Sequence, residues 1–291
     1  MEAKGLLIGE LEFKNPVILA SGTFGVDEYT DFLDYSKIGG VTLKTVTLSP
    51  REGNPPPRIL EVRCGLLNSI GLENDGFENF VKKLRETAFL KNLSTNKIVS
   101  IAGDCESDFS KMVRVLSEFD SIDMFELNLS CPNLHEGGIN FDSNFRVVRN
   151  IVRAVAKISR KPFTVKLGPS GDLVVNSKVA EDYGADALTI SNTFLATAID
   201  IKKRAFYFKN KVAGYSGPAV KPMALWNVYR VSNIVKIPVI ASGGICDTSD
   251  AIEFLMAGAR FISTGTMNFV EPSISLKIAE ELERIKVGRI E

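Results

Sequence analysis

Short apolar runs alternate with longer amphipathic stretches along most of the chain. Most of the short runs are rich in Val, Ile and Leu with little polar interruption, which is typical of parallel strands covered on both faces. Eight such runs lie at residues 16–20, 40–44, 98–102, 123–128, 163–167, 187–191, 238–241 and 261–264. Apolar residues recur with a helical period in most of the gaps, which predicts helices at about 75–90, 106–118, 143–158, 172–183, 222–235, 248–257 and 272–285.

Several helix ends carry matching signals. Gly184 and Gly258 follow the last periodic residues of two stretches, where a helix end favours a left-handed residue. Asp247, Thr248 and Ser249 offer N-caps to another helix. Eight strands separated mainly by helices within 291 residues predict an α/β fold, a (β/α)8 TIM barrel, with a doubly wound open sheet as the alternative.

The remaining segments are expected to cover the two ends of this barrel. Residues 5–13 alternate weakly before the first strand, and we interpret them as an N-terminal hairpin that closes the barrel bottom. The connections 45–75 and 192–221 are long and irregular, and long loops after barrel strands usually build the site or its lid. Without a low-complexity linker or a convincing repeat, the chain is expected to form one domain, 1–291.

Composition and charge narrow the function classes. The 35 basic residues balance the 35 acidic ones, so nothing indicates nucleic acid or a membrane surface as a partner. No run approaches the roughly 20 apolar residues of a membrane helix. The four cysteines are scattered without a C-x-x-C pair, which argues against an iron–sulfur site, a metal finger or a disulfide framework. With a single histidine, His135, and no signal-peptide pattern, we expect a cytoplasmic protein without a metal site.

Two lysines stand at equivalent places at the ends of apolar runs. Lys44 ends the second run, and Lys166 lies near the end of the fifth. Active sites of this architecture gather at the carboxyl ends of the strands. A lysine there must reach solvent or find an anionic partner, because burying an ammonium group alone is costly. Either lysine alone is equally well explained as solvated or salt-bridged, but the pair favours a bound anion or an electron-rich ring.

Small residues follow the last two strands. Gly243 and Gly244 come after the seventh run, and Gly265 and Thr266 come after the eighth. Glycines let backbone N–H groups approach a ligand closely, and barrels commonly bind phosphate at this place. Two such turns on adjacent strand ends favour a phosphate group over simple tight turns.

A third group consists of asparagines around a cysteine. Asn68, Asn128, Asn133 and Asn192 lie on or beside strand-end loops, and amides that both donate and accept suit a flat heterocycle with N–H and C=O groups. Each of them alone is more often a turn residue. Cys131 stands between two of these amides, where a positioned thiol could act as a general base, although an arbitrary cysteine is more often an inert buried thiol.

A series of short motifs in one order extends these observations over nearly the whole chain. They lie at 15–16, 20–25, 44–47, 50–55, 67–72, 126–133 (Glu-Leu-Asn-Leu-Ser-Cys-Pro-Asn), 165–167, 191–193, 216–219, 243–245 and 265–266. As a set they resemble the class 1 dihydroorotate dehydrogenases, and most of all the class 1B catalytic subunit. The resemblance implies an FMN-dependent oxidation of dihydroorotate to orotate in pyrimidine synthesis, at the mouth of a (β/α)8 barrel.

The resemblance also implies roles for individual residues. Cys131 would be the base that removes a proton from C5 of dihydroorotate while a hydride passes from C6 to N5 of the flavin. The substrate would be bound by Lys44, Asn68, Ser69, Ile70, Gly71, Leu72, Asn128, Asn133, Asn192 and Thr193. FMN would be bound by Ser21, Lys44, Thr45, Ser100, Asn128, Lys166, Ser191, Gly217, Gly243, Gly244, Gly265 and Thr266, with Gly243, Gly244, Gly265 and Thr266 at its phosphate. Ser100 and Ser191 depart from the family, which often has Asn and an apolar residue there.

Electron transfer is the least determined part of this resemblance. Class 1B catalytic subunits pair with an FAD and [2Fe–2S] subunit that passes electrons to NAD, whereas class 1A relatives are homodimers that reduce fumarate. We expect a dimer that joins such an iron–sulfur subunit in a heterotetramer. The alternatives are an oxidoreductase resembling dihydropyrimidine (dihydrouracil) dehydrogenase, or a flavin-free barrel that binds a phosphate group.

Overall fold

Eight parallel strands close into a barrel in the computed structural model, which describes residues 5–23, 33–88, 90–130, 132–133, 139–140, 144–169, 171–285 and 288. The strands are β3 (Val17–Leu19), β4 (Gly40–Thr42), β8 (Asn96–Ala102), β9 (Met124–Asn128), β12 (Phe163–Leu167), β13 (Ala187–Ile190), β18 (Val239–Ser242) and β19 (Phe261–Thr264). Each strand pairs with the next, and β19 pairs with β3, which completes the circle. The short β5 (Val46–Thr47) adds to β8 beyond β4. The predicted barrel is confirmed, and the open sheet is not formed.

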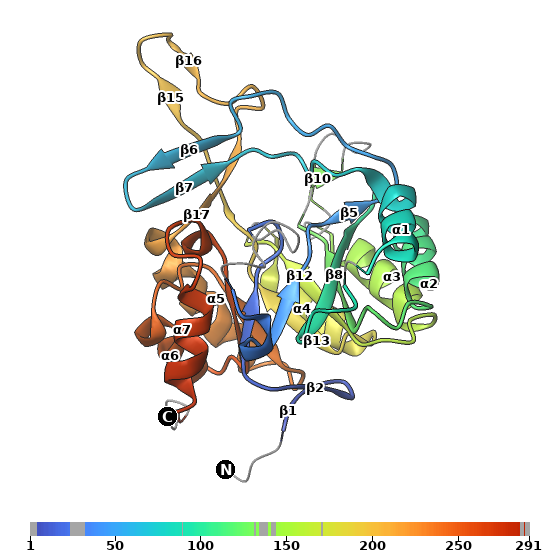
Figure 1. Ribbon diagram of the computed structural model, residues 1–291. Helices are drawn as coiled ribbons and strands as arrows, with labels where there is room; N and C mark the ends of the chain where they lie inside the picture. The colour runs from blue at the N-terminus through green and yellow to red at the C-terminus, as the bar shows by residue number, and fades with distance from the viewer. Residues whose placement is uncertain are drawn as a thin grey trace.

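Seven α-helices surround the barrel in the described part of the chain (Figure 1). They are α1 (Gly76–Glu86), α2 (Glu106–Leu116), α3 (Phe145–Ala156), α4 (Leu173–Asp182), α5 (Lys221–Ser232), α6 (Thr248–Met256) and α7 (Ile274–Leu282). Each matches a predicted stretch, to within a few residues at its ends. Asp247 caps α6 by accepting a hydrogen bond from the N–H of Asp250, and Gly184 and Gly258 have the positive φ expected after a helix.

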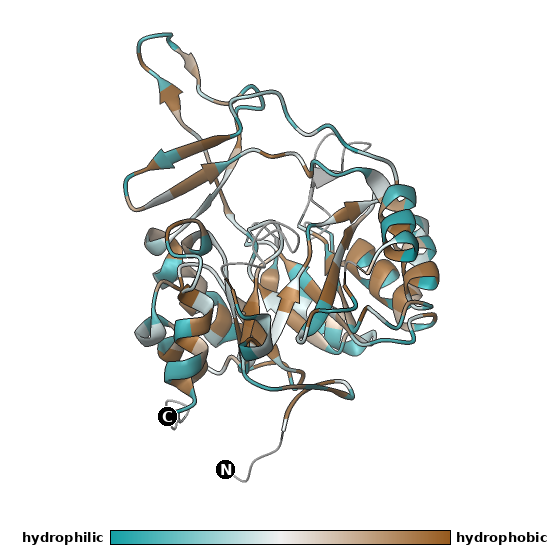
Figure 2. Ribbon diagram, viewed as in Figure 1, coloured by the Kyte–Doolittle hydropathy of each residue, from teal (hydrophilic) through white to brown (hydrophobic). Residues whose placement is uncertain are grey.

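Alternate residues of the barrel strands belong to two different apolar clusters. The outward set, which includes Val17, Phe125 and Val165, packs with the buried faces of the helices. Figure 2 shows this as hydrophobic strands beneath helices whose outer turns are hydrophilic. The inward set contains Ile18, Ile98, Met124, Ala187, Ile240 and Phe261. The two-residue period of each strand thus assigns one face to the helices and the other to the barrel interior.

An N-terminal hairpin fills the bottom of the barrel, as predicted. It consists of β1 (Leu6–Ile8) and β2 (Leu11–Phe13), paired antiparallel. Ile8 and Phe13 are buried within the inward cluster, and the Phe13 ring meets that of Phe261 edge-on at 4.9 Å between centroids. The hairpin therefore closes the end of the barrel opposite the predicted site.

The barrel interior becomes polar above this plug. Three buried polar residues, Ser100, Glu126 and Thr189, each lie two positions further along their strand than an apolar inward residue. Thr164 is also buried and lies in register with Glu126 on the neighbouring strand. Thr164 Oγ1 and Thr189 Oγ1 share a hydrogen bond of 3.0 Å across β12 and β13. The upper interior is thus lined with hydrogen-bonding groups rather than packed with hydrocarbon.

The two long connections are more ordered than the sequence predicts. They contribute β6 (Ile59–Val62), β7 (Gly65–Asn68), β14 (Phe194–Ala196) and β17 (Ala213–Ser216) to one antiparallel sheet in the order β14-β17-β7-β6. This sheet lies above the barrel mouth, and the hairpin β15 (Ile199–Asp200) and β16 (Ala205–Phe206) projects beyond it (Figure 1). The remaining elements are three short helical turns, η1 (Tyr35–Lys37), η4 (Pro218–Val220) and η5 (Thr266–Phe269). A short antiparallel pair is formed by β10 (Pro132–Asn133) and β11 (Ile139–Asn140). Among the described helices, none has the length and apolar character needed to cross a membrane.

Candidate active site

Three hydroxyl groups link the ends of neighbouring strands at the barrel mouth. Ser21 follows β3, Thr45 follows β4, and Ser100 lies on β8. Thr45 Oγ1 is 3.1 Å from Ser21 Oγ and 2.9 Å from Ser100 Oγ. Ser100 is completely buried and Thr45 nearly so. This chain of hydroxyls fixes one side of the mouth and brings together three residues predicted to bind FMN.

Lys44 extends into the open mouth without an ion-pair partner among the described residues. It lies two residues after the end of β4, and its side chain is exposed. An ideal Cβ at Gly22 would lie 3.9 Å from Lys44 Nζ, so the two loops adjoin. Desolvation by the surrounding protein lowers the pKa of Lys44, with Glu73 raising it and Arg58 lowering it to smaller extents. An unpaired ammonium group in this position is suited to an anionic ligand.

Lys166, by contrast, is buried and paired. It lies on β12 opposite Asn128 of β9, and its Nζ is 3.7 Å from Glu126 Oε1 on β9. Glu126 Oε1 is buried and accepts no hydrogen bond within the described part of the chain. The carboxylate therefore compensates the charge of Lys166 without a close contact, and the lysine stays at the floor of the mouth.

Asn128 and Asn192 meet across the mouth. Asn128 Oδ1 accepts hydrogen bonds from Ser130 Oγ at 2.8 Å and from Asn192 Nδ2 at 3.4 Å. Asn192 Nδ2 also donates to Ser130 Oγ, and Asn192 Oδ1 accepts from the N–H of Thr193 at 2.8 Å. Ser191 is buried beside them, and its hydroxyl bonds the carbonyl of Asn192 at 3.0 Å. The two amides are thus oriented by hydrogen bonds, as a polar recognition surface requires.

Residues from the sheet above the mouth reach the same place. Asn68 ends β7 and donates from Nδ2 to the carbonyl of Gly214 on β17 at 3.3 Å. An ideal Cβ at Gly214 would come within 2.2 Å of Thr193 Oγ1, so only glycine lets Thr193 and Asn68 lie against this strand together. Ser69, Ile70, Gly71 and Leu72 continue from Asn68 along the edge of the mouth.

The glycine-rich turns occupy the ends of β18 and β19, which are adjacent strands. Gly243 and Gly244 have φ of +123° and +77°, and an ideal Cβ at Gly244 would lie 2.6 Å from the backbone N of Lys221 at the start of α5. Gly265 precedes η5, with the side chain of Thr23 nearby. Gly217, at φ +105°, packs against Gly65. The close approach of backbone, without side chains between, suits a phosphate group.

Several predicted residues lie outside the part of the chain that the structure describes. Cys131 and His135 are among them, and for Asn133 only the backbone strand β10 is described. Leu129 and Ser130 directly precede Cys131; Leu129 is buried, and Ser130 is held by Asn128 and Asn192. Of the other cysteines, Cys64 and Cys105 are exposed, while burial and Asp250 raise the pKa of the Cys246 thiol to about 11. Cys246 is therefore a poor nucleophile at neutral pH.

Sequence reasoning missed four residues that shape the mouth. Glu126 and Ser130 belong to the quoted motif at 126–133, which the prediction used only for Asn128, Cys131 and Asn133. Asn268 on η5 is buried and joins Thr23 Oγ1 at 2.9 Å to the carbonyl of Thr264 at 3.1 Å. Asn54 was part of a matched motif at 50–55, but no role was assigned to it. A polar residue inside an apolar strand was the only signal that could have indicated Glu126.

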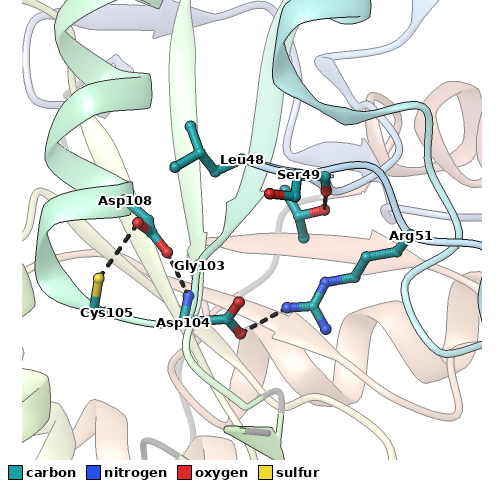
Figure 3. Close-up of a pocket in the computed structure, with 8 residues that line it drawn as sticks. Leu48, Ser49, Arg51, Gly103, Asp104, Cys105 and Asp108 are labelled. Atoms are coloured by element: carbon teal, nitrogen blue, oxygen red, sulfur yellow. Dashed lines mark hydrogen bonds and ion pairs between the residues drawn. The ribbon is translucent and has the colours of Figure 1, made fainter. Parts of the chain in front are cut away.

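A separate cavity lies beside the mouth between the β5 and β8 connections, with a volume of about 250 Å3 (Figure 3). Arg51 Nη2 pairs with Asp104 Oδ1 at 2.7 Å across it, and Asp108 accepts hydrogen bonds from the Asp104 N–H and the Cys105 thiol. The backbone of Arg51 also exchanges two hydrogen bonds with Asn74. These contacts fasten both ends of the 51–74 connection rather than form a second site.

Comparison with known proteins agrees with this geometry. A family model described as dihydroorotate dehydrogenase matches residues 6–285. The dihydroorotate dehydrogenase B (NAD(+)) catalytic subunit of Thermoanaerobacter sp. (strain X514) is 45% identical, with 96% of this chain and 92% of that protein aligned. Proteins of the same name from Petrotoga mobilis and Bacteroides thetaiotaomicron are 45% and 42% identical, covering 95% and 94% of this chain and 92% and 90% of their own lengths.

Proposed function

The chain belongs to the dihydroorotate dehydrogenase family, and we propose that it oxidises dihydroorotate to orotate with FMN, as the catalytic subunit of a two-component enzyme. The predicted membership is thereby confirmed, along with its likeness to class 1B catalytic subunits. The family match over 6–285 carries the proposal. The arrangement of Lys44, Asn68, Asn128 and Asn192 around one mouth supports it, because these residues were expected to bind the substrate.

The mouth suits FMN in both its charge and its shape. Gly243, Gly244 and Gly265 offer backbone to the phosphate on adjacent strand ends, where a Cβ at Gly244 would collide with the start of α5. Lys44 and Lys166 bring positive charge to the place where the flavin ring would lie. Bound FMN supplies, at its N5, the acceptor for the hydride that leaves C6 of dihydroorotate. Ser21, Thr45 and Ser100, whose hydroxyls are linked on one side of the mouth, would contact the bound flavin.

The protein's own part in the reaction is to orient the substrate and to take one proton. Asn68, Asn128, Asn192 and Thr193 present amide and hydroxyl groups that match the N–H and C=O groups of a dihydropyrimidine dione, and Asn133 is proposed to join them. Lys44 attracts its carboxylate. The base is Cys131, which removes the C5 proton. A free thiol is ionised by only a few per cent near neutral pH, which suffices when the site positions it.

A partner subunit would carry the electrons onward. The relatives are named as catalytic subunits of an NAD(+) enzyme, which implies a further subunit. We propose that this partner holds FAD and an iron–sulfur cluster, and that two copies of each subunit assemble. Exposed apolar side chains above the mouth support contact with another chain; they are Ile59, Leu195, Ile199, Ile201 and Phe206.

Anaerobic mixing tests the substrate. Dihydroorotate should bleach the flavin absorbance of the purified holoprotein within one turnover, and dihydrouracil, which lacks the carboxylate, should not. Bleaching by dihydrouracil alone would transfer the chain to the dihydropyrimidine dehydrogenase reaction. A colourless protein that cannot be reconstituted with FMN would favour the flavin-free barrel.

Substitution of Cys131 tests the base. Cys131→Ala should keep its FMN and lose about 100-fold or more of its flavin reduction rate at neutral pH, the range typical of general-base catalysis. Cys131→Ser should recover more activity at high pH, because a hydroxyl is the weaker acid. The exposed Cys105, changed to Ala, is the matched control and should keep the wild-type rate. A Cys131→Ala rate near wild type would remove this residue from the base role.

A further inference from the structure

The segment from Ser69 to Leu72 is held from outside the mouth by one residue of the preceding connection. We propose that Asn54 is a positioning residue, which fixes the backbone of this segment so that it can bind the substrate. The inference rests on the proposed function, because it takes the segment's ligand to be dihydroorotate or orotate. Asn54 itself contacts the segment at Ser69 and Ile70.

Asn54 bonds two successive residues of the segment. Its backbone N–H donates to the carbonyl of Ile70 at 2.9 Å. Its side-chain Nδ2 donates to both the carbonyl and the hydroxyl oxygen of Ser69, each at 3.1 Å. The backbone hydrogen bond fixes the position of Ile70, and the side-chain amide of Asn54 fixes the orientation of the Ser69 peptide group.

The backbones of residues 53–54 and 70–71 are in contact without intervening side chains. An ideal Cβ at Gly71 would lie 2.7 Å from Asn54 Cγ, and one at Gly53 would lie 2.5 Å from the Ile70 carbonyl oxygen. Both glycines also have φ of +78°, which residues with a Cβ rarely adopt. The fit leaves Asn54 little freedom to move, so its position is transmitted directly to Ser69 and Ile70.

Arg58 holds Asn54 in place. Its Nε donates to the Asn54 carbonyl at 2.5 Å, its Nη2 donates to the Glu52 carbonyl at 2.7 Å, and its Nη1 pairs with Glu73 at 2.8 Å. The Arg58 carbonyl in turn accepts from the Ser69 N–H at 2.7 Å. Asn54, Arg58 and the segment therefore form a closed ring of contacts, and Glu73 pairs with Arg58 from the end of the segment. Each of the three members of the ring is fixed by the other two, as a rigid binding edge requires.

The ring borders the ligand site. Its inner side is tied to the sheet above the mouth, because Ser69 Oγ donates to the Val212 carbonyl at 3.2 Å and Asn68 bonds Gly214. Arg58 and Glu73 lie close enough to Lys44 to influence its charge state. A shift of the segment would therefore change the edge of the mouth that faces Lys44, while the turns of Gly243 and Gly265 belong to other elements.

Orotate binding to the holoprotein tests the proposal, followed as the change that it causes in flavin absorbance. Asn54→Ala should weaken orotate about three- to tenfold, the effect of one or two neutral hydrogen bonds. The KM for dihydroorotate should rise by a similar factor, with kcat changed less than about twofold. Asn54→Asp keeps the shape but turns an acceptor toward the Ser69 carbonyl, so it should weaken orotate at least as much.

Controls separate positioning from general stability. Asn79→Ala removes an amide from the exposed face of α1, where Nδ2 bonds only the Asp75 carbonyl, and should leave orotate affinity unchanged. Ser69→Ala removes the hydroxyl that accepts from Asn54 and donates to the Val212 carbonyl, and leaves the bond from Asn54 to the Ser69 carbonyl. In a double-mutant cycle, Asn54→Ala combined with Ser69→Ala should weaken orotate by less than the product of the two single effects. FMN content should stay at the wild-type level in every variant.

Each result has one meaning. Wild-type orotate affinity in Asn54→Ala overturns the positioning role, as does full affinity in Asn54→Asp or loss of FMN together with orotate. If Asn54→Ala does not fold, full orotate affinity in Ser69→Ala likewise overturns it. The failure of the proposed function has a different signature, because the wild-type holoprotein itself would then neither bind orotate nor be bleached by dihydroorotate.

Discussion

Two lysines at the same mouth are held in opposite ways. Lys166 is buried with Glu126 nearby, whereas Lys44 projects into the opening with no carboxylate in contact among the described residues. The sequence predicted both as ligand-binding cations from their places at strand ends, and the structure brings both to the mouth. The sequence could not distinguish the two lysines, because the difference depends on Glu126. This residue lies on another strand, so its pairing with Lys166 could not be predicted from the sequence.

The unpaired state of Lys44 predicts opposing effects on stability and binding. Below its lowered folded-state pKa, the ammonium is charged in both folded and unfolded chains, so the folded state carries the full desolvation penalty. As pH rises through that pKa toward the unfolded value, the penalty disappears. Lys44→Met should therefore raise the melting temperature of FMN-free protein most at neutral pH and progressively less at alkaline pH, as followed by thermal unfolding.

The same substitution should weaken orotate binding by roughly tenfold or more, the usual effect of losing a charge-assisted hydrogen bond. FMN affinity should fall as well, which fluorescence titration of the FMN-free protein would measure. Lys37→Met, which removes an exposed lysine paired with Glu280, is a suitable comparison and should leave both ligands unaffected. Unchanged affinity in Lys44→Met would count against its place between flavin and substrate.

At the scale of elements, periodicity determined most of what could be predicted. Strands and helices were found because each has an apolar face with a period of 2 or 3.6 residues. The sheet above the mouth was not found, because β7 pairs with β17 and its register joins Leu67 to Tyr215, residues from two different connections. Local sequence does not encode such a pairing. The ring around Asn54 escaped prediction for the same reason.

The ion pair between β9 and β12 gives a prediction at this scale. Glu126→Gln would leave the buried Lys166 without its carboxylate, and should lower the free energy of unfolding by about 3–5 kcal/mol in urea titrations. Glu118→Gln breaks an ion pair with Arg160 that is shorter, at 2.9 Å, but lies on the exposed surface, and should change the free energy of unfolding by less than about 1 kcal/mol. Equal losses in the two variants would show that Lys166 does not depend on Glu126.

At the scale of the whole molecule, one end of the barrel is closed by apolar side chains and the other carries the polar mouth. The β1–β2 hairpin seals the bottom with apolar side chains, and both long connections rise over the mouth (Figure 1). This division was predictable, because strand direction alone places every strand's carboxyl end on one side. The destination of the electrons was not predictable in this way, because the proposed partner subunit leaves no pattern in this sequence beyond the family likeness.

Purified alone, the chain should therefore complete only half of the reaction. Dihydroorotate should reduce its flavin, but NAD+ should not reoxidise it at a rate matching the reduction. Addition of the proposed iron–sulfur subunit, purified from the native source, should restore steady turnover with NAD+. Rapid NAD+ reduction by the isolated chain would contradict the need for a partner.

The alternation along the barrel strands has a consequence for how this protein can change. Outward residues such as Val165 and Leu127 pack with the helices and carry most of the apolar burial, while inward neighbours such as Thr164, Lys166 and Asn128 face the interior. A substitution at an inward position therefore alters what the mouth can accept while leaving the shell around it intact. Ser100 is such a position, since it is fully buried and its hydroxyl bonds Thr45 at the mouth. The polar upper lumen of the barrel is in this sense a layer that can vary separately from the shell, except where a buried pair such as Glu126 and Lys166 also stabilises the fold.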